Sequence, residues 1–240
     1  MIFGIRAIIE AIDAGKEIDK ILIKKDLQGE LARELFNYLK GSRIPLQRVP
    51  VERLNRITRK NHQGVIAYTT QISYQHIDDI IPTLFEEGRH PFLLLLDGLT
   101  DVRNFGAIAR TAECAGVDSI IIGSKNSVSV NADAIKSSAG ALHKIPVCRE
   151  ENLTGTIKYL KNCGIQIIAA TEKGDTAYTD TNYTSPLCLI LGAEDHGIPQ
   201  EHLALCDSWA KIPILGTIGS LNVSVAAGVL IYEVVRQRGL

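Results

Sequence analysis

Hydrophobic positions in the first third of this 240-residue chain alternate between short apolar runs and helical spacing. Leu31, Leu35 and Leu39 lie four residues apart, the step of an amphipathic helix. The pattern predicts helices over residues 5–14, 28–40 and 51–58, and strands over 18–24, 45–49 and 64–69. Alternation of this kind indicates a small α/β/α layer.

After a short polar linker at residues 71–76, the apolar runs become longer. The run FLLLLD at 92–97 is continuous, which is typical of a strand buried on both faces of a parallel sheet. A helix at 77–87, with Pro82 near its first turn, is expected before it. Further helices are expected at 104–116, 131–140, 153–163 and near 199–205, with strands at 119–122, 145–148, 165–170, 187–191 and 209–214. The fold class is therefore α/β with a mostly parallel sheet covered on both sides.

The last part of the chain, residues 212–238, combines three features of a ligand site. An apolar run at 211–215 is expected to end a buried strand, and a turn containing Gly216 and Gly219 follows it. Ser220 or Asn222 can cap the helix that comes next. A ring of free backbone N–H groups at such a turn binds phosphate or a nucleotide-like cofactor, although an ordinary strand–turn–helix corner has the same pattern.

Composition places the chain among ordinary globular proteins, with 45% hydrophobic and 22% charged residues. Its longest apolar run, at residues 92–96, is too short to span a bilayer, and the start lacks a signal-peptide pattern. The five cysteines are widely spaced and include no CxxC pair. We expect a cytoplasmic protein without disulfides, structural zinc or membrane attachment.

Charge is divided unevenly along the chain. Residues 1–75 contain 13 Lys/Arg and 8 Asp/Glu, whereas the remainder contains 13 and 19. Within 43–60 a single acid, Glu52, accompanies six cations: Arg43, Arg48, Arg53, Arg56, Arg59 and Lys60. A helix from Val51 would place Arg53, Arg56 and Lys60 on one face. Such a face can neutralise backbone phosphates of RNA or DNA, although most charged helix faces are simply solvated.

Three glycine-containing segments follow predicted strand ends, where open α/β sheets bind ligands. They are DGLTDVRNFGAIAR at 97–110, LGAEDHGIP at 191–199 and the segment that begins at residue 212. No GxGxxG fingerprint, P-loop or nucleophile elbow is present in the sequence, which disfavours a nicotinamide oxidoreductase, a P-loop enzyme and a serine hydrolase. No His/Cys/carboxylate spacing indicates a metal site.

Taken together, NFGAIAR at 104–110, LGAEDHGIP at 191–199 and IPILGTIGSLNVSVAAG at 212–228 resemble motifs 1, 2 and 3 of the SpoU (TrmH) family. These are RNA ribose 2′-O-methyltransferases of the SPOUT class, and the resemblance covers residues 90–238. The first 75 residues, including NHQGVIA at 61–67, resemble the L30e-like substrate-binding domain fused to many members. The expected domains are residues 1–71 for substrate binding, 72–87 for a linker and first helix, and 88–240 for the methyltransferase.

The resemblance implies a deep trefoil knot, an S-adenosylmethionine cofactor held there and a homodimer with the site near its interface. The cofactor contacts that it implies are Thr171, Gly192, Ile212 and Leu221. Arg110 corresponds to the arginine required for deprotonation of the ribose hydroxyl, and the other polar site residues correspond to Asn104, Glu194, Ser220 and Asn222. Because arginine stays protonated in proteins, stabilisation of the forming alkoxide is an alternative to a literal base.

The pairing of domains is most similar to members that methylate a guanosine ribose in large-subunit (23S) rRNA. Three alternatives stay open: the same reaction on tRNA, the same reaction on another rRNA nucleoside, and a non-catalytic RNA-binding assembly factor. The complete set of polar residues that includes Asn104 and Arg110 argues against the last of these.

Overall fold

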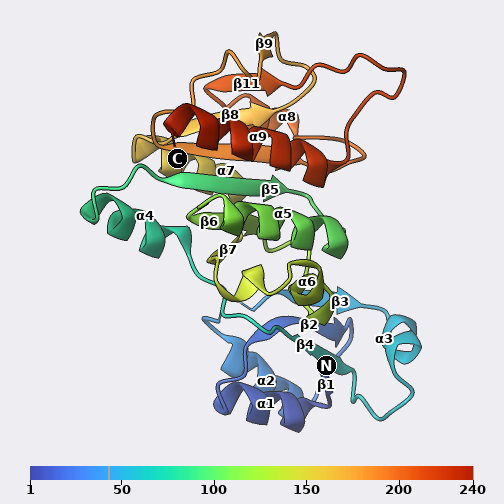
Figure 1. The fold of residues 1–240 in the computed structure, drawn as a ribbon. Helices are drawn as coiled ribbons and strands as arrows, with labels where there is room; N and C mark the ends of the chain where they lie inside the picture. Colours follow the sequence, from blue (N-terminus) through green and yellow to red (C-terminus); the bar gives the residue numbers. More distant parts are fainter. Residues whose placement is uncertain (43, 240) are drawn as a thin grey trace. The chain divides into compact units, whose positions relative to one another are not determined.

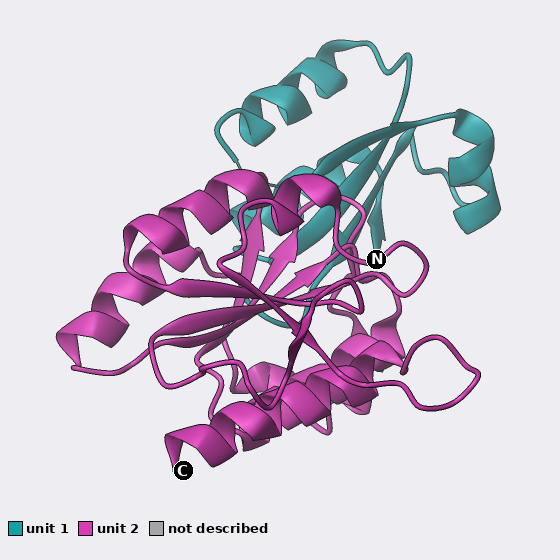
Figure 2. Ribbon diagram, turned by 90° about the horizontal axis from the view of Figure 1, so that it is seen from above, with its two compact units in different colours: residues 1–73 teal, residues 74–240 magenta. Residues whose placement is uncertain are grey.

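The computed structural model describes residues 1–42 and 44–239, which form two compact units (Figures 1 and 2). The first unit is Met1–Ser73 and the second is Tyr74–Leu240, and each has its own sheet. Arg43, one of the six basic residues named above, lies outside the described residues. None of the helices in the described part of the chain combines the length and apolar character needed to cross a membrane.

The first unit contains a four-stranded sheet with the strand order β1-β4-β2-β3. Strands β2 and β3 are parallel, whereas β4 runs antiparallel to β1 and β2. Its elements are β1 (Ile2–Phe3), α1 (Ile5–Asp13), β2 (Ile18–Lys24), α2 (Glu30–Leu39), β3 (Leu46–Val49), α3 (Val51–Ile57) and β4 (Val65–Thr69). The α/β/α organisation expected from the alternating pattern is confirmed.

Alternate side chains of β2 pack on opposite faces of this sheet, as the strand period of two requires. Ile21 and Ile23 pack in one cluster with residues of α1 and α2. Leu22 belongs to the other cluster, together with Leu54 of α3. Helix α3 is therefore held by the apolar side that contains Leu54, and its remaining faces are free to carry polar residues.

The second unit contains a seven-stranded, all-parallel sheet in the order β7-β6-β5-β10-β8-β11-β9. Its strands are β5 (Phe92–Asp97), β6 (Ser119–Gly123), β7 (Val147–Glu150), β8 (Gln166–Ala170), β9 (Thr176–Ala177), β10 (Leu187–Gly192) and β11 (Ser208–Lys211). Its helices are α4 (Ile77–Glu86), α5 (Val102–Cys114), α6 (Ala132–Ser137), the 3-10 turn η1 (Ala141–His143), α7 (Leu153–Asn162), α8 (Gln200–Leu203) and α9 (Val223–Arg238).

Helices cover both faces of this sheet (Figure 2). Leu93 and Leu95 of β5 pack in a cluster with α4, α7 and α8. The alternate residues Leu94 and Leu96 are equally buried and face the opposite side, where α5 packs against α6 and α9. Burial of every β5 side chain explains the continuous apolar run in the sequence.

The order of strands changes direction at β5. The chain proceeds outward from β5 to β6 and β7, then crosses to the other side, where β10 lies between β5 and β8. In open parallel sheets, such a reversal leaves a crevice at the carboxyl ends of the strands. Any site built there draws on the segments that follow β8, β10 and β11.

Several element boundaries differ from the expected ones for identifiable reasons. Helix α5 begins at Val102 rather than Asn104, because the Asp101 carboxylate accepts hydrogen bonds from two backbone N–H groups of the first turn. Strand β11 ends at Lys211, so the apolar run beyond it does not end a buried strand, and Leu215 is 98% exposed. Pro82 lies inside α4, at its sixth position, just beyond the first turn.

The predicted linker at residues 71–76 is partly structured, because Gln75 bridges in parallel to Cys148 and extends the sheet edge beside β7. The two-residue strands β1 and β9 were too short to show a hydrophobic pattern. The threading of residues 212–222 that would make a trefoil knot stays a prediction.

All five cysteines lie in the described part of the chain and are free. Cys148 and Cys188 are buried in strands, where loss of hydration disfavours the thiolate. Burial raises the pKa of the Cys148 thiol to about 12 and also raises the pKa of the Cys188 thiol. Both behave as small core residues rather than nucleophiles.

Candidate functional site

A pocket of about 580 Å³ lies at the carboxyl end of the second sheet. Segments that follow three strands line it: residues 170–172 after β8, 191–197 at the end of β10, and 212–223 after β11. Ala226 in the first turn of α9 completes the wall. Two of the three glycine-containing segments of the sequence therefore meet in one cavity, and its size lies within the usual range of small-ligand sites.

Residues 212–221 carry backbone groups that have no partner among residues 1–42 and 44–239, and positions 212, 214 and 219–221 of this segment line the pocket. Within the described parts of the chain, no backbone N–H or C=O group of these ten residues makes a hydrogen bond. Backbone polar groups in folded proteins are nearly always paired with protein, water or ligand. A segment with so many free donors and acceptors beside a cavity is suited to hold a polar ligand through its main chain.

Gly192, at the end of β10, allows the chain to fold back on itself at very close range. A Cβ atom placed there would lie 2.2 Å from the Gly197 carbonyl carbon, so no other residue fits without moving the backbone. Gly197 has a φ of 69°, and its N–H donates to the Ala193 carbonyl at 2.9 Å. The resulting tight turn places Glu194 at the edge of the pocket.

Three polar residues that are far apart in the sequence form one hydrogen-bonded cluster. The Asn104 and Asn222 amides both donate to the Glu194 Oε1 atom, at 3.0 Å and 2.9 Å. The Asn222 amide also donates to the Asn104 Oδ1 atom at 3.1 Å. The carboxylate oxygen is thus held by two amide donors, and the three motifs are fastened together at the pocket.

Local helix capping orients two members of this cluster. The Asn222 Oδ1 atom accepts from the Ser224 N–H at the start of α9, which turns the amide nitrogen of Asn222 toward Glu194. Asn104 lies in the first turn of α5, and its backbone N–H is held by Asp101. Each amide is therefore set by a helix terminus rather than by a mobile loop alone.

The structure brings together all four residues expected at the cofactor: Thr171, Gly192, Ile212 and Leu221 all line the pocket. Glu194, Ser220 and Asn222 line it as well. The pocket is mixed in character, because apolar side chains such as Leu191 and Val223 alternate with these polar groups and the free backbone of 212–221. This combination fits S-adenosylmethionine, which has an apolar and aromatic part, a polar amino-acid part and a sulfonium.

Arg110 is not brought to this pocket. It lies in the third turn of α5 with an exposed side chain, and among the described residues it has no hydrogen bond or ion pair. Asn104 and Arg110 are six residues apart, so they leave the helix in different directions. Its expected role at the ribose hydroxyl stays a prediction.

Sequence reasoning missed Asp101 and the pocket residue Glu172. The signal for Asp101 was present, since an aspartate directly before an apolar helical pattern is a common N-cap. Nothing in the local pattern of residues 170–172 marked Glu172, because its place is set by the pairing of β8 with β10 and β11. No group of His, Cys, Asp and Glu side chains in the described residues could hold a metal ion.

In the first unit, the other five basic residues of the 43–60 stretch are exposed at the surface. Arg53 and Arg56 lie on α3, whereas Lys60 lies beyond the end of that helix at Ile57, which corrects the expected common face. The guanidinium of Arg48 donates to the Lys25 carbonyl at 3.3 Å and lies 5.9 Å from the Phe36 ring centroid. Arg59 is exposed in the loop that follows α3.

Comparison with known protein families matches both units. Residues 91–232 match the SpoU rRNA methylase family. Residues 1–75 match a family described as RNA 2′-O ribose methyltransferase substrate binding. The two matches together cover most of the chain.

Similar curated proteins include TrmH-family tRNA/rRNA methyltransferases from Staphylococcus saprophyticus and Staphylococcus epidermidis. Each is 35% identical over 238 residues, which is 99% of this chain and 96% of the relative. The similarity therefore extends over both units.

Solved structures similar to this chain include the SpoU methyltransferase AviRb from Streptomyces viridochromogenes in complex with the cofactor AdoMet. It is 26% identical with a TM-score of 0.63, and the match covers 99% of this chain and 89% of that one. An AdoMet-bound rRNA methyltransferase from Sinorhizobium meliloti is 25% identical with a TM-score of 0.63, covering 98% of this chain and 86% of that one. The α/β fold with a mostly parallel sheet is the fold of these enzymes.

Proposed function

We propose that this chain, which belongs to the SpoU rRNA methylase family, methylates the 2′-oxygen of a guanosine ribose in large-subunit (23S) rRNA. Its membership makes it an S-adenosylmethionine-dependent RNA methyltransferase. The finer assignment is our proposal: rRNA as the substrate, guanosine as the nucleoside, and the activity of the large-subunit rRNA guanosine 2′-O-methyltransferases called RlmB. It is supported by the substrate-binding match over residues 1–75, joined to a methylase domain.

One observation carries the assignment of the site. The free backbone groups of residues 212–221 and the Asn104–Glu194–Asn222 cluster lie at the same pocket, at the carboxyl end of the sheet. The first feature suits a cofactor held by the main chain, and the second places fixed polar side chains beside it. The close packing of Gly192 against Gly197 sets the turn that carries Glu194.

When bound, S-adenosylmethionine would supply an electrophilic methyl group on its sulfonium sulfur for transfer to an oxygen nucleophile. The sulfur would leave as a neutral thioether. The residues of this chain have the tasks of binding, orienting and holding charge. Fixed geometry is the main requirement, since in-line placement alone can remove several kcal/mol of a barrier, of order 7–11 kcal/mol in favourable cases. Glu194, held at Oε1 by two amides, keeps its second carboxylate oxygen for a donor of the substrate.

Arg110 acts on the ribose hydroxyl in this proposal, through electrostatic stabilisation of the alkoxide that forms as the hydroxyl proton passes to solvent water. Because its side chain lies away from the pocket of its own chain, a second protomer is needed to bring the groups together. We propose a homodimer. Exposed apolar side chains on and before α9, namely Leu221, Val225 and Tyr232, support an interface on this helix.

The test is transfer of labelled methyl groups from S-adenosylmethionine to protein-free large-subunit rRNA, small-subunit rRNA and bulk tRNA. The label is then mapped to base or ribose. Ribose label on a guanosine of the large-subunit RNA is the expected outcome. Label on tRNA or on another nucleoside would keep the chemistry and overturn the substrate.

Arg110→Ala is run alongside, and we expect it to lower the transfer rate by about a hundredfold or more while S-adenosylmethionine affinity stays within twofold. Arg103→Ala is the matched control, because Arg103 is also an exposed arginine on α5. Equal rates for the wild type and Arg110→Ala would contradict the role of this arginine. Cofactor binding without transfer to any RNA would favour the non-catalytic assembly factor.

A further inference from the structure

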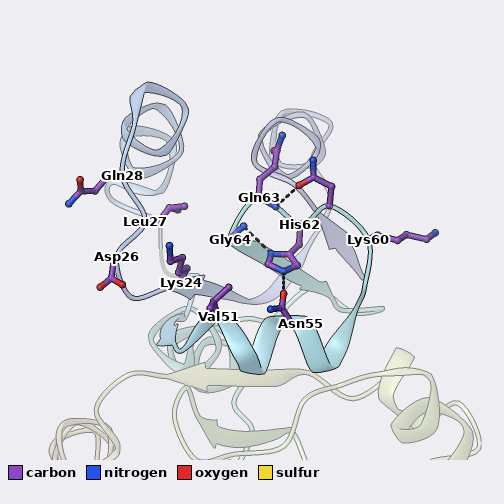
Figure 3. A pocket seen from close by; sticks show the side chains of 11 residues that line it. Lys24, Asp26, Leu27, Gln28, Val51, Asn55, Lys60, His62, Gln63 and Gly64 are labelled. Carbon is purple, nitrogen blue, oxygen red and sulfur yellow. Dashed lines mark hydrogen bonds between the residues drawn. The ribbon is translucent and has the colours of Figure 1, made fainter.

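A second pocket, of about 530 Å³, lies wholly within the first unit (Figure 3). Its walls come from the end of β2 and the loop after it (Lys24 and residues 26–28), from α3 (Val51 and Asn55) and from the loop at 60–64. The loop is packed closely against the opposite wall, since a Cβ on Gly64 would lie 3.0 Å from the Leu27 side chain. The backbone at Gly64 therefore packs directly on the side chains of Leu27 and Lys24.

His62 forms the inner end of this pocket and is only 8% exposed. Its Nδ1 atom accepts a hydrogen bond from the Gly64 N–H at 3.0 Å. The proton of the neutral ring is therefore on Nε2, which donates to the Asn55 Oδ1 atom at 2.8 Å. Figure 3 shows the imidazole between these two partners.

This chain of bonds fixes the orientation of the Asn55 amide. Its oxygen is used by His62, so its nitrogen carries two N–H donors, and neither has a partner among the described residues. Gln63 has a φ of 51°, and its side-chain oxygen accepts from the Ile5 N–H at 2.9 Å, which ties the loop to the start of α1. A buried histidine and a strained loop thus serve to present one amide group.

The remaining lining groups complement a nucleotide. Leu27 and Val51 supply apolar surface for the faces of a base, next to the Asn55 donors. Lys24 supplies a cation for a phosphate, whereas the Lys60 ammonium lies 5.4 Å from the Phe3 ring centroid. Single-stranded RNA is recognised through unstacked bases whose polar edges are hydrogen-bonded in this way.

Helix α3 places phosphate-binding groups next to this pocket. Val51 and Asn55 are one helical turn apart and face the cavity, whereas Arg53 and Arg56 lie on another side of the same helix and are exposed. An RNA strand that follows the arginines would pass the mouth of the pocket. This supplies a reason for a polar cavity beside a basic surface.

We propose that this pocket takes up one unpaired nucleotide of the RNA, with its base edge on Asn55 and its phosphate on Lys24. The proposal rests on the proposed function insofar as it takes RNA as the ligand. It concerns binding only and involves no chemical step.

The decisive variant is Asn55→Asp in the full-length protein. The new carboxylate keeps an acceptor for the His62 Nε2–H, so the loop stays in place, but it removes both amide donors. Asn37→Asp is the matched control, because Asn37 is an exposed asparagine of α2 in the same unit and the change adds the same charge. Before binding is measured, the melting temperatures of both variants are shown to equal that of the wild type.

Binding is measured by fluorescence anisotropy with a labelled single-stranded RNA of mixed sequence, at constant salt and without S-adenosylmethionine. We expect Asn55→Asp to weaken binding about tenfold or more, because a well-placed pair of hydrogen bonds to a base edge is lost. Asn37→Asp should stay within twofold. A fully paired duplex of the same length should show no difference between the two variants.

The proposal would be overturned if the two variants bound the single strand with equal affinity. It would also be overturned if Asn55→Asp lost as much affinity for the duplex as for the single strand. The four nucleoside 5′-monophosphates are then tested as competitors. If the monophosphates bind while Asn55→Asp keeps the wild-type affinity for RNA, the pocket is a site for free mononucleotides instead. Because this assay needs no methyl transfer, its failure is distinct from failure of the proposed function.

Discussion

At the scale of single residues, a buried chain of hydrogen bonds fastens the sheet edge below the cofactor pocket. The Asp97 Oδ2 atom lies 2.6 Å from the His202 Nδ1 atom, and the Nε2 atom of the same ring lies 3.0 Å from the Thr154 hydroxyl. Asp97 and His202 are each 6% exposed. These hydrogen bonds join the end of β5 to α8 and α7, and so support the turn that follows β10.

We predict that His202→Ala will destabilise the protein by about 3–5 kcal/mol, because it leaves the Asp97 carboxylate buried without its partner. Thr154→Val is the control, since it removes only the outer bond and should cost about 1 kcal/mol. Thermal unfolding followed by circular dichroism measures both. Melting temperatures of the two variants within 1 °C of each other would show that the inner pair contributes no more than the outer bond.

At the scale of elements, helix termini position side chains of the candidate site. Asn222 uses its oxygen to cap α9 and its nitrogen to hold Glu194. Asn152 caps α7 through the Gly155 N–H and has no part in the pocket. The same residue type therefore serves stability alone in one helix and both stability and the site in the other.

We predict that Asn222→Asp will keep the cap but lower kcat/KM for methyl transfer by about tenfold to a hundredfold, since hydrogen bonds to a charged group contribute about 1.5–3 kcal/mol each. Two carboxylates would then face each other where an amide and Glu194 now meet. Asn152→Asp makes the same change at the other cap and should leave the rate near that of the wild type. A similar loss in both variants would show that the effect comes from helix capping.

At the scale of the whole molecule, the proposed homodimer predicts an interface on α9. Val225 and Tyr232 of α9 are 52% and 53% exposed, and they lie seven residues apart, which places them on one side of the helix. Large apolar side chains grouped in this way on a globular protein commonly mark an interface.

We predict that Tyr232→Glu will shift the protein from dimer to monomer and reduce methyl transfer at least tenfold, because a buried, unpaired charge opposes association. Phe85→Glu is the control, since Phe85 is an exposed apolar residue of α4, at 40%. Light scattering coupled to size exclusion measures the mass. A monomeric wild type with full activity would contradict the homodimer.

Much of the fold could be predicted from local patterns. Strands β2 and β5 occupy the expected residues, because each is a continuous or alternating apolar run that must be buried. The observed element boundaries differ from the predicted ones where a single polar side chain caps a helix, as at Asp101, or where an apolar run is exposed, as at Leu215. A hydrophobic pattern carries no information about which apolar residues a ligand or a second protomer will cover.

The candidate site was determined in part by sequence and in part by folding. The residue types of the three motifs, including Asn104, Glu194 and Asn222, were fixed by sequence and pointed to a family. Their common hydrogen bonds were decided only by the parallel order of β5, β10 and β8, which brings distant strand ends to one edge. The pocket around His62 and the exposure of Arg110 likewise depend on tertiary packing, because neither the direction of a side chain nor the depth of a cavity is encoded in spacing along the chain.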